Sequence, residues 1–394
     1  MQVLKEQRTP AAPEHEVERA LAAGLPNGTD QALVLTGVRR CGKSTLQAQL
    51  MRQYQSALYL NLEDTRLFGL SPEDFPTLLN AISELAPAGA AMFLDEVQEV
   101  PEWQRFVRAL LDDRRAVCLT GSNASLLGQE LGARLTGRHL SYEVFPFSYP
   151  EYLAFTGQSP GVESLHGFLD DGGFPSYLRE RRPLVLQELL RDIVQRDIAQ
   201  RHHLRESRHV MNLLLFLLAN TGQPVSLQRI TKSLAIPAVG QTSRYLEYLQ
   251  DAYLLFAVPK FSQSLKQRVV APNKYYAVDN GLRRANVPDF APPDVGRRLE
   301  NAVFLALRQR ERGVCYAGEK DLWECDFVTG NAVIQVCAEL TPTNRKREIG
   351  GLTSACRLGG KRHAFILTLN QRDRLSEQGV DVVVQPAWEW LQEV

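Results

Sequence analysis

The stretch that decides the fold is Gly37-Val38-Arg39-Arg40-Cys41-Gly42-Lys43-Ser44. It matches the phosphate-binding loop pattern G-x-x-x-x-G-K-[ST], which a chain of this length meets by accident only about once in a hundred sequences. The apolar run 32–36 predicts a buried parallel strand before the loop, and residues 44–51 predict a helix after it. Glycines let the backbone N–H groups of such a loop point at a phosphate, and the helix N-terminus adds positive potential. The loop therefore predicts a nucleotide site.

The loop also assigns a chemical role to its last residues. Lys43 is expected to reach the β- and γ-phosphates, and the Ser44 hydroxyl is expected to hold Mg²⁺. The implied cofactors are ATP and Mg²⁺. The residues predicted to surround the nucleotide are Gly37, Val38, Arg39, Arg40, Cys41, Gly42, Lys43, Ser44 and Thr45.

A second apolar strand, residues 90–94, ends in the adjacent acids Asp95 and Glu96, which is the Walker B arrangement. Asp95 is expected to hold Mg²⁺, either directly or through water. Glu96 is placed to polarise the attacking water, and this favours hydrolysis over transfer of the phosphoryl group to a metabolite. The alternative is a strand that ends in two solvated acids.

Two further groups are candidates for the chemistry of ATP. Ser122 and Asn123 follow the apolar strand 116–121 and could orient the water or sense the γ-phosphate, although both residue types also favour caps and turns. Arg134 and Arg138 could reach the γ-phosphate of a neighbouring subunit and stabilise the charge that develops in hydrolysis. The alternative for these arginines is a salt bridge or a solvated face.

The composition excludes several classes of protein. The chain has 394 residues, and its 45 Lys plus Arg balance its 45 Asp plus Glu, so a nucleic-acid surface would have to be local. No apolar run is long enough to span a bilayer, and residues 1–6 do not resemble a secretory signal, so a cytoplasmic protein is expected. The six cysteines lack the spacing of metal ligands and are expected to be reduced thiols.

Changes in sequence pattern along the chain predict five segments. An N-terminal segment, 1–30, precedes an α/β unit of alternating strands and helices at 31–150. A helical linker follows at 151–209, with one helix expected from 177 to 201. Residues 210–285 form a third pattern, and 290–394 form a second α/β unit.

The segment 210–285 predicts a winged helix-turn-helix. Helices are expected at 210–220, 224–234 and 240–251, followed by strands at 253–258 and 274–278. Such a unit can enter a DNA groove, or it can act as a packing module between domains. The residues predicted to contact DNA are Gln241, Thr242, Arg244, Tyr245, Lys260, Lys266 and Arg268.

Taken together, these motifs resemble those of the prokaryotic AAA-type ATPases. The resemblance is carried by 37–46, 59–64, 93–98, 120–123 and 135–138, and then by 172–175, 192–198, 324–327 and 334–337. The later runs resemble the branch that carries a C-terminal domain of unknown function. The resemblance implies an AAA+ ATPase core, a winged helix and a C-terminal fold similar to PD-(D/E)XK nucleases. It also implies homo-oligomers in which arginines act on a neighbour.

The nuclease resemblance fails at the positions that would carry the chemistry. Asp326 fills the first acidic position and Glu300 could supply a helix acid, but Gln335 and Cys337 stand where an acid and a lysine belong. Glu339 is expected on the same strand face as Gln335 and could partly compensate. We therefore expect a nuclease-like fold that is inactive.

Three functions follow from these features. The first is a Mg²⁺-dependent ATP hydrolase that acts on DNA in repair, recombination or the processing of branched or forked DNA. The second is a nucleotide-gated switch that binds protein partners, and the third is an ATP-regulated, metal-dependent nuclease.

Overall fold

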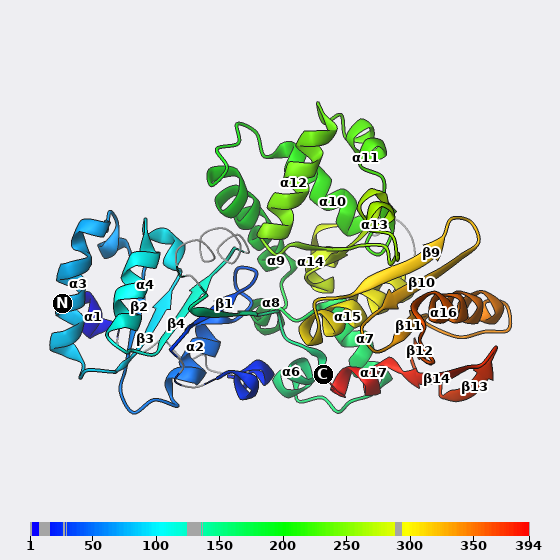
Figure 1. The fold of residues 1–394 in the computed structure, drawn as a ribbon, viewed down its shortest axis with the longest axis horizontal. Helices are drawn as coiled ribbons and strands as arrows, with labels where there is room; N and C mark the ends of the chain where they lie inside the picture. Colours follow the sequence, from blue (N-terminus) through cyan, green and yellow to red (C-terminus); the bar gives the residue numbers. More distant parts are fainter. Residues whose placement is uncertain are drawn as a thin grey trace. The chain divides into compact units, whose positions relative to one another are not determined.

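The computed structural model describes residues 2–7, 16–26, 28, 30–123, 135, 137–287 and 294–393. The chain divides into two compact units (Figure 1). The first unit holds residues 1–145 together with Asp251–Tyr253, and the second holds the remainder. Arg134 lies outside the described residues.

The first unit is built on a five-stranded sheet in the order β2-β3-β4-β1-β5, and all neighbouring strands run parallel, as predicted. The central strands β1, β3 and β4 are buried along their whole length, which explains why their sequences are continuously apolar. The strands are β1 (Ala32–Thr36), β2 (Ala57–Asn61), β3 (Ala91–Asp95), β4 (Val117–Gly121) and β5 (His139–Glu143).

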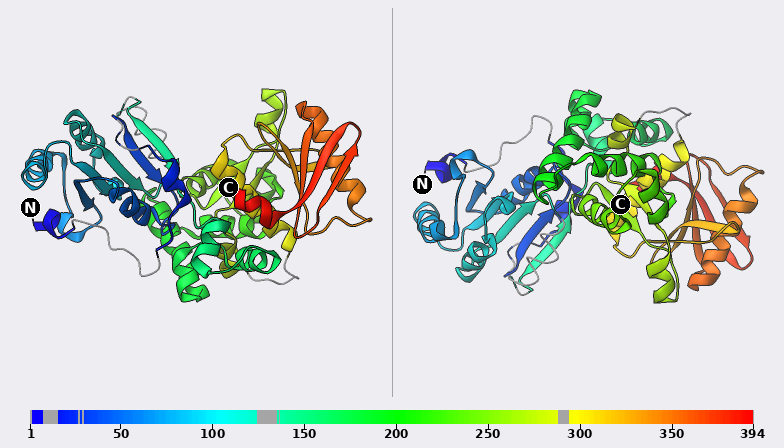
Figure 2. Two further views of the ribbon diagram at one scale, coloured as in Figure 1. Left: turned by 90° about the horizontal axis from the view of Figure 1, so that it is seen from below. Right: turned by 90° about the horizontal axis from the view of Figure 1, so that it is seen from above.

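Helices cover both faces of this sheet (Figures 1 and 2). Alternate strand residues such as Val34, Leu94 and Leu119 share one core with α3 (Phe75–Leu85) and α4 (Trp103–Asp112). The helix α2 (Lys43–Met51) packs against β3 and β4, where its Gln47 side chain donates to the carbonyl oxygens of Leu94 and Cys118. The helix α1 (Gln2–Glu6) contacts β2, and one-turn 3₁₀ segments lie at Ala20–Gly24, Thr65–Leu67, Pro72–Asp74 and Val97–Glu99.

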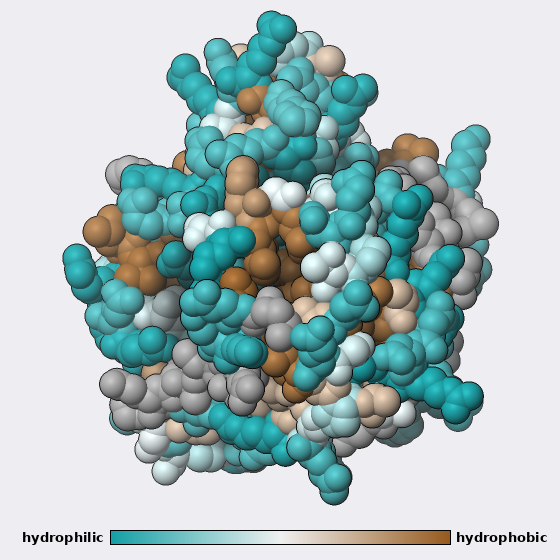
Figure 3. All heavy atoms as spheres, turned by 90° about the vertical axis from the view of Figure 1, so that its left-hand side faces the viewer, coloured by the Kyte–Doolittle hydropathy of each residue, from teal (hydrophilic) through white to brown (hydrophobic). Residues whose placement is uncertain are grey.

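Most of the apolar side chains are buried in the cores of the two units. On the face drawn in Figure 3 hydrophilic residues dominate, and apolar ones gather in a few places. Among the described residues, no helix has both the length and the hydropathy needed to cross a bilayer.

The second unit begins with helices α6 (Tyr149–Thr156), α7 (Val162–Asp171), α8 (Pro175–Glu180) and α9 (Pro183–Asp192), and α9 continues as a π-helix at Ile193–Gln200. The segment 177–201 is helical, as expected, but it is interrupted by one break at 181–182. Arg181 adopts a left-handed conformation, with φ 54°, just before Pro183 begins the next helix. Proline disfavours a helical conformation at the residue before it. Arg182, which precedes Pro183, is accordingly extended, and the helix is interrupted there.

Three helices and a small sheet follow. The helices are α10 (Arg208–Ala219), α11 (Leu227–Ser233) and α12 (Val239–Asp251), and the antiparallel sheet has the order β6-β8-β7. Its strands are β6 (Pro224–Val225), β7 (Leu255–Val258) and β8 (Asn273–Ala277), with α13 (Leu265–Val270) before β8 and α14 (Asn280–Asn286) after it. The helix expected from 224 begins only at 227, because Pro224 and Val225 pair with β8 and Ser226 caps the helix.

The unit ends in a six-stranded sheet, in the order β13-β14-β12-β11-β10-β9. The helix α16 (Arg345–Gly359) shares one core with this sheet, and the Phe304 ring of α15 (Val295–Arg310) packs near the Phe327 ring of β10, 6.2 Å between centroids. The strands are β9 (Cys315–Glu319), β10 (Trp323–Val328), β11 (Val333–Val336), β12 (His363–Thr368), β13 (Asp373–Glu377) and β14 (Val380–Pro386), followed by α17 (Ala387–Trp390) and a 3₁₀ turn at Leu391–Glu393.

Candidate nucleotide site and C-terminal acid cluster

The sheet order brings the predicted nucleotide residues to one edge. β4 lies between β1 and β3, and all three strands run in the same direction. The loop that follows β1, Ser122 after β4 and Glu96 after β3 therefore leave the sheet at its carboxyl edge, side by side. Ligand sites of open parallel sheets lie at this edge.

The loop needs its two glycines for physical reasons. A Cβ on Gly37 would lie 2.1 Å from the carbonyl oxygen of Val144, so no side chain fits there. Gly42 has φ 104° and would place a Cβ 2.7 Å from the guanidinium of Arg19. Only glycine accepts both the left-handed backbone and the close approach. The backbone can thus curl into a cradle for an anion.

Lys43 and Ser44 occupy the first turn of α2, directly after this cradle. The Lys43 ammonium donates to the carbonyl oxygens of Gly37 and Val38, at 3.0 and 3.2 Å. The Ser44 hydroxyl donates to the Asp95 carboxylate at 2.7 Å. The two residues predicted to share a Mg²⁺ ion are therefore in direct contact, although they lie 51 positions apart in the chain.

Asp95 accepts hydrogen bonds from three hydroxyl groups. Besides Ser44, these are Tyr59 from β2, at 2.7 Å, and Thr120 from β4. Burial, together with the charge of Asp95, raises the pKa of Tyr59 far above its ordinary value, so its hydroxyl remains a donor. The sequence analysis missed Tyr59 and Thr120, because nothing in a single strand reveals which residue of a neighbouring strand it will face.

Glu96 leaves the strand in a left-handed conformation, with φ 53°. Its N–H donates to the Thr120 hydroxyl at 3.0 Å, and the Gln98 amide donates to its carboxylate. The side chain is half-buried, and so it is held in place without being sealed from solvent. Ser122 and Asn123 are almost fully buried, 4% and 1% exposed, between the ends of β3 and β1.

Arg19 is a further residue that the sequence analysis missed. It is 4% exposed, and its guanidinium donates to the carbonyl oxygens of Cys41, at 2.9 Å, and Phe145, at 2.7 Å. It thus fastens the phosphate-binding loop to the segment after β5. Its position in a short polar stretch, well before the motif, carries no signal of this role.

Of the two candidate arginine fingers, the structure describes only Arg138. Arg134 lies outside the described residues. Arg138 precedes β5, its carbonyl oxygen accepts from the N–H of Ala32, and its side chain pairs with Asp112 at 2.7 Å. It therefore lies at the amino edge of the sheet, roughly 13 Å from the loop edge at about 3.3 Å per residue. Arg138 cannot serve the nucleotide site of its own chain.

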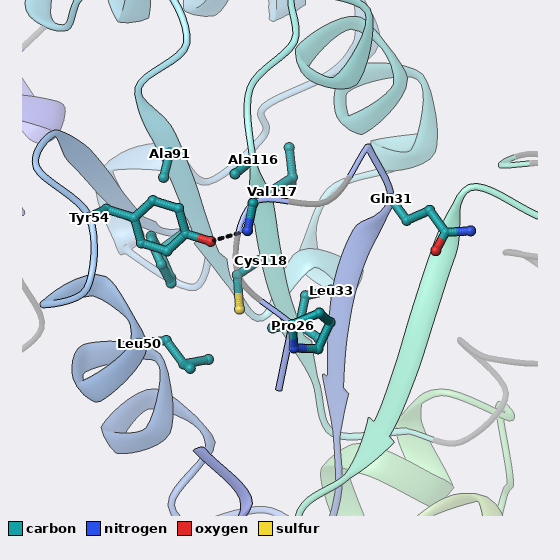
Figure 4. A pocket seen from close by; sticks show the side chains of 11 residues that line it. Pro26, Gln31, Leu33, Leu50, Tyr54, Ala91, Ala116, Val117 and Cys118 are labelled. Carbon is teal, nitrogen blue, oxygen red and sulfur yellow. Dashed lines mark hydrogen bonds between the residues drawn. The ribbon is translucent and has the colours of Figure 1, made fainter. Parts of the chain in front are cut away.

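A small pocket also opens at the amino ends of these strands (Figure 4). Leu33, Ala91 and Val117 line it, and the N–H of Gly28 donates to the Tyr54 hydroxyl beside it at 3.2 Å. None of the phosphate-loop residues lines this pocket, so it is separate from the candidate nucleotide site.

The structure corrects part of the predicted DNA-contacting set. Thr242 is 0% exposed and its hydroxyl bonds to that of Thr231, and Tyr245 is 4% exposed. Both side chains belong to the interior of the three-helix region and cannot meet a groove. Gln241 is half-buried and donates to the Tyr245 hydroxyl, whereas Arg244 is exposed.

Part of the segment predicted to form the wing pairs with another strand and is not free to contact DNA. Lys260 forms a β-bridge with Tyr316, and the N–H of Phe261 donates to the Tyr316 carbonyl oxygen at 2.6 Å. The segment after β7 thus covers the edge strand β9, which would otherwise present unpaired backbone groups. Lys266 and Arg268 in α13 remain exposed.

Three of the predicted nuclease-like residues, Glu300, Asp326 and Gln335, lie close together, and a lysine lies beside the two acids. The N–H of Asp326 donates to the Gln335 side-chain oxygen at 3.3 Å, and the Asp326 carboxylate accepts from the N–H of Val336 at 2.9 Å. Close to Asp326 and Glu300 lies the ammonium of Lys274, 3.5 Å from the first carboxylate and 3.4 Å from the second. Lys274 comes from β8, outside the predicted domain, and the sequence analysis did not select it.

Glu339 does not compensate for Gln335. The strand β11 ends at Val336, so strand alternation no longer applies at 339, and the Glu339 side chain is exposed. The acid that faces Gln335 is Glu348 of α16, which is 3% exposed and accepts from the Gln335 amide at 2.7 Å. Burial raises the pKa of the Cys337 thiol to about 12, so it is uncharged near neutral pH, and all six cysteines are buried and free of disulfides.

Comparison with known proteins identifies two domains along the chain. A family model described as an AAA domain matches residues 29–153, and a second, described as a domain of unknown function (DUF8612), matches residues 163–290. Among solved structures, the chain is similar to the Walker-type ATPase PABY2304 of Pyrococcus abyssi, with a TM-score of 0.46, 16% identity, and coverage of 72% of this chain and 99% of the other. It is also similar to the Aeropyrum pernix ORC1 protein solved in complex with DNA, with a TM-score of 0.30, 15% identity, and coverage of 65% and 85%.

Two relatives are closer in sequence. An uncharacterized protein of Methanocaldococcus jannaschii is 32% identical over 348 residues, which cover 80% of this chain and 76% of the relative. An uncharacterized protein of Haemophilus influenzae is 33% identical over 337 residues, which cover 79% and 84%. The chain therefore belongs to the same protein family as these two relatives, and its first unit carries an AAA-type P-loop ATPase domain.

Proposed function

We propose that the protein is a Mg²⁺-dependent ATP hydrolase whose nucleotide cycle acts on DNA through the second unit. The contact that carries the hydrolase part is the 2.7 Å hydrogen bond between Ser44 and Asp95, directly beside Lys43 and the glycine cradle. A hydroxyl and a carboxylate that meet at the end of a phosphate-binding loop are the oxygen ligands that Mg²⁺ uses together with nucleotide phosphates.

The residues present fit ATP and Mg²⁺. Gly37 and Gly42 allow the loop to pack closely against Val144 and Arg19, in a backbone conformation that lets its N–H groups point at a phosphate. Lys43 would exchange its two loop carbonyls for phosphate oxygens, to which an ammonium forms stronger, charge-assisted bonds. The bound metal ion would neutralise charge that develops on the transferred phosphoryl group.

Glu96 is the proposed general base. A carboxylate at the end of β3, one strand away from the strand that leads into the phosphate loop, can accept a proton from, or orient, the attacking water. The hydrogen bond from the Glu96 N–H to the Thr120 hydroxyl positions the backbone of Glu96. The Gln98 amide donates to the Glu96 carboxylate and orients it. Ser122 and Asn123, at the end of the intervening strand, are proposed to sense the γ-phosphate, while Arg134 and Arg138 are retained only as candidates that act on a neighbouring subunit.

The DNA part rests on the arrangement of α10, α11 and α12 with the β6-β8-β7 sheet, which fits a winged helix-turn-helix. The proposed contact residues are now confined to exposed basic side chains. These are Arg244 of α12, Lys266 and Arg268 of α13, and Arg229 and Lys232 of α11.

A second candidate function is a nucleotide-gated switch that binds a protein partner. The observations that favour it are the burial of Thr242 and Tyr245, the wing segment docked on β9, and the exposed acid Glu247 one turn from Arg244. A helix surface of mixed charge is poorly suited to a phosphate backbone.

One experiment separates the two candidates. ATP turnover is measured for the purified chain alone and with single-stranded, duplex, forked and four-way-junction DNA, with Glu96→Gln as the hydrolysis control. We expect stimulation by at least one DNA form, lost in Glu96→Gln and reduced in an Arg244→Ala/Arg268→Ala double variant. Arg105→Ala, which changes an exposed arginine of the first unit, is the matched control. Turnover that no DNA alters, and no DNA binding at low salt, would contradict the DNA part and leave the switch.

A further inference from the structure

A buried lysine lies at the centre of the C-terminal acid cluster. The side chain of Lys274 is 1% exposed, and its ammonium lies 2.6 Å from the carboxylate of Glu324, 3.4 Å from that of Glu300 and 3.5 Å from that of Asp326. The Tyr276 hydroxyl donates to the same Glu300 oxygen at 2.6 Å. A buried ammonium with three carboxylates around it is a cation enclosed by anionic ligands, and not a surface ion pair.

The strand geometry shows how two acids come to face this lysine. The register between β9 and β10 shifts between Cys325 and Val328, as in a β-bulge. Cys325 and Val328 belong to the core beneath α16, whereas Asp326 contacts Lys274 and Phe327 packs on Phe304. Glu324 and Asp326 share one face of β10 by the regular alternation of a strand, and the bulge then brings Phe327 to that face as well.

The electrostatics keep the lysine charged. Burial alone would lower the pKa of Lys274, but the charges of Glu300, Asp326 and Glu324 outweigh it and raise the pKa above its ordinary value. Burial raises the pKa of Glu300, and it raises that of Asp326 to about 8. The cluster therefore keeps its ammonium, whose charge opposes the effect of burial on the pKa of both acids.

The same residues do not fit a divalent metal ion. Gln335 offers a neutral amide and Cys337 a protonated thiol where a metal-dependent nuclease needs an acid and a lysine. Within the described part of the chain, no group of three or more His, Cys, Asp or Glu side chains is arranged to hold a metal. A Mg²⁺ or Mn²⁺ ion at about 2.1 Å from these carboxylate oxygens would lie against the ammonium.

We propose that Lys274 is the built-in cation of this cluster: its ammonium takes the place of a divalent metal ion and joins β8, α15 and β10 without one. The domain then needs no metal to hold its acids together, and it cannot use them for metal-dependent cleavage. The lysine also joins two sheets of the second unit, because β8 belongs to the three-stranded sheet and β10 to the six-stranded sheet.

The test is Mn²⁺ binding to the full chain without nucleotide, measured by electron paramagnetic resonance. All variants carry Asp95→Asn, so that the first unit lacks the charged ligand of its proposed metal site. With Lys274 present, we expect no Mn²⁺ site that depends on Asp326. With Lys274→Ala, we expect one Mn²⁺ site that binds at least tenfold more tightly, and we expect Lys274→Ala/Asp326→Asn to lose it. Lys266→Ala, an exposed lysine of the same unit, should behave like the parent chain.

Two results would overturn the proposal. One is a tight Mn²⁺ site in the chain that retains Lys274, removed by Asp326→Asn. The other is a folded Lys274→Ala variant, judged by circular dichroism, that gains no site. If Lys274→Ala does not fold, thermal unfolding of the Asp95→Asn chain decides. A midpoint unchanged by Mn²⁺ or by a chelator supports the proposal, and a Mn²⁺-dependent rise that Asp326→Asn abolishes contradicts it.

Discussion

Asp95 and Asp326 are both buried acids on strands, but their surroundings differ in kind. Asp95 accepts from the neutral hydroxyls of Ser44, Tyr59 and Thr120, whereas Asp326 faces the ammonium of Lys274. Hydroxyl groups orient a carboxylate without cancelling its charge. An ammonium cancels that charge and fills the space beside it.

This difference shows how two acids of the same type serve different ends. In the proposed function, the hydroxyl-bonded acid is available to a cation that arrives with the nucleotide. The lysine-bonded acid already has its cation, so it contributes to structure. The local sequence does not reveal this difference, because Lys274 lies 52 positions before Asp326.

The sharpest test of the comparison exchanges both acids for amides. We expect Asp95→Asn to lower kcat for ATP by about 100-fold or more, because the metal ion loses its charged ligand. Asp326→Asn should change kcat by less than about twofold. Steady-state turnover of the two variants measures this. An equal loss in both would show that Asp326 also serves hydrolysis.

The next largest effect concerns stability. Lys274→Met should lower the free energy of unfolding of the second unit by about 3–5 kcal/mol, because it leaves buried carboxylates without their cation. Urea unfolding followed by circular dichroism gives the value. Lys266→Met, on an exposed surface, is the control and should stay within about 0.5 kcal/mol. A loss for Lys274→Met no larger than that of the control would mean that the ammonium is not needed.

The third prediction concerns Arg19, a buried residue that positions the phosphate-binding loop. Arg19→Ala removes charge-assisted bonds to the carbonyls of Cys41 and Phe145, so we expect the KM for ATP to rise about tenfold, or roughly 1.4 kcal/mol. Arg52→Ala removes the surface pair between Arg52 and Glu16 and should leave KM unchanged. Equal KM values in the two variants would contradict a positioning role for Arg19.

A smaller effect is the pH dependence that Asp326 contributes. Burial, followed by the charge of Glu300, raises its folded pKa to about 8 from an ordinary 3.8. The folded chain therefore holds a proton that the unfolded chain releases, so this stability is complete below about pH 4 and is lost as pH rises through about 8. Urea unfolding across that range should show a smaller decline in Asp326→Asn than in the parent chain. Parallel curves would exclude the raised pKa.

The smallest expected effect is that of Arg138. Its exposed pair with Asp112 should be worth about 0–1 kcal/mol, and Arg138→Ala should leave ATP turnover within about twofold when the chain is monomeric. If turnover instead falls strongly and wild-type turnover rises with protein concentration, Arg138 acts on a neighbouring subunit.

The sequence predicted the loop after β1 and the parallel strands around it, because the information for both is local. Lys43 and Ser44 are fixed relative to the loop by a few covalent bonds, and buried parallel strands are recognisable as short apolar runs. The adjacent acids after 90–94 were equally readable. The edge strand β13, with its exposed polar residues, and the two-residue β6 carried no such signal and were missed.

The predictions that failed depended on contacts between distant segments. Thr242 and Tyr245 look suitable for a surface in one helix, but packing of α12 against α11 buries them.

The sequence by itself therefore determined the phosphate-binding loop, the parallel strands around it and the acids that follow them, because short-range geometry specifies all three. Only the tertiary structure decided which partner each acid meets. Asp95 receives hydroxyls from β2, β4 and α2, and Asp326 receives the ammonium of Lys274, which lies 52 positions before it in the chain. Strand order and register determine these partners, and both depend on burial of the whole sheet.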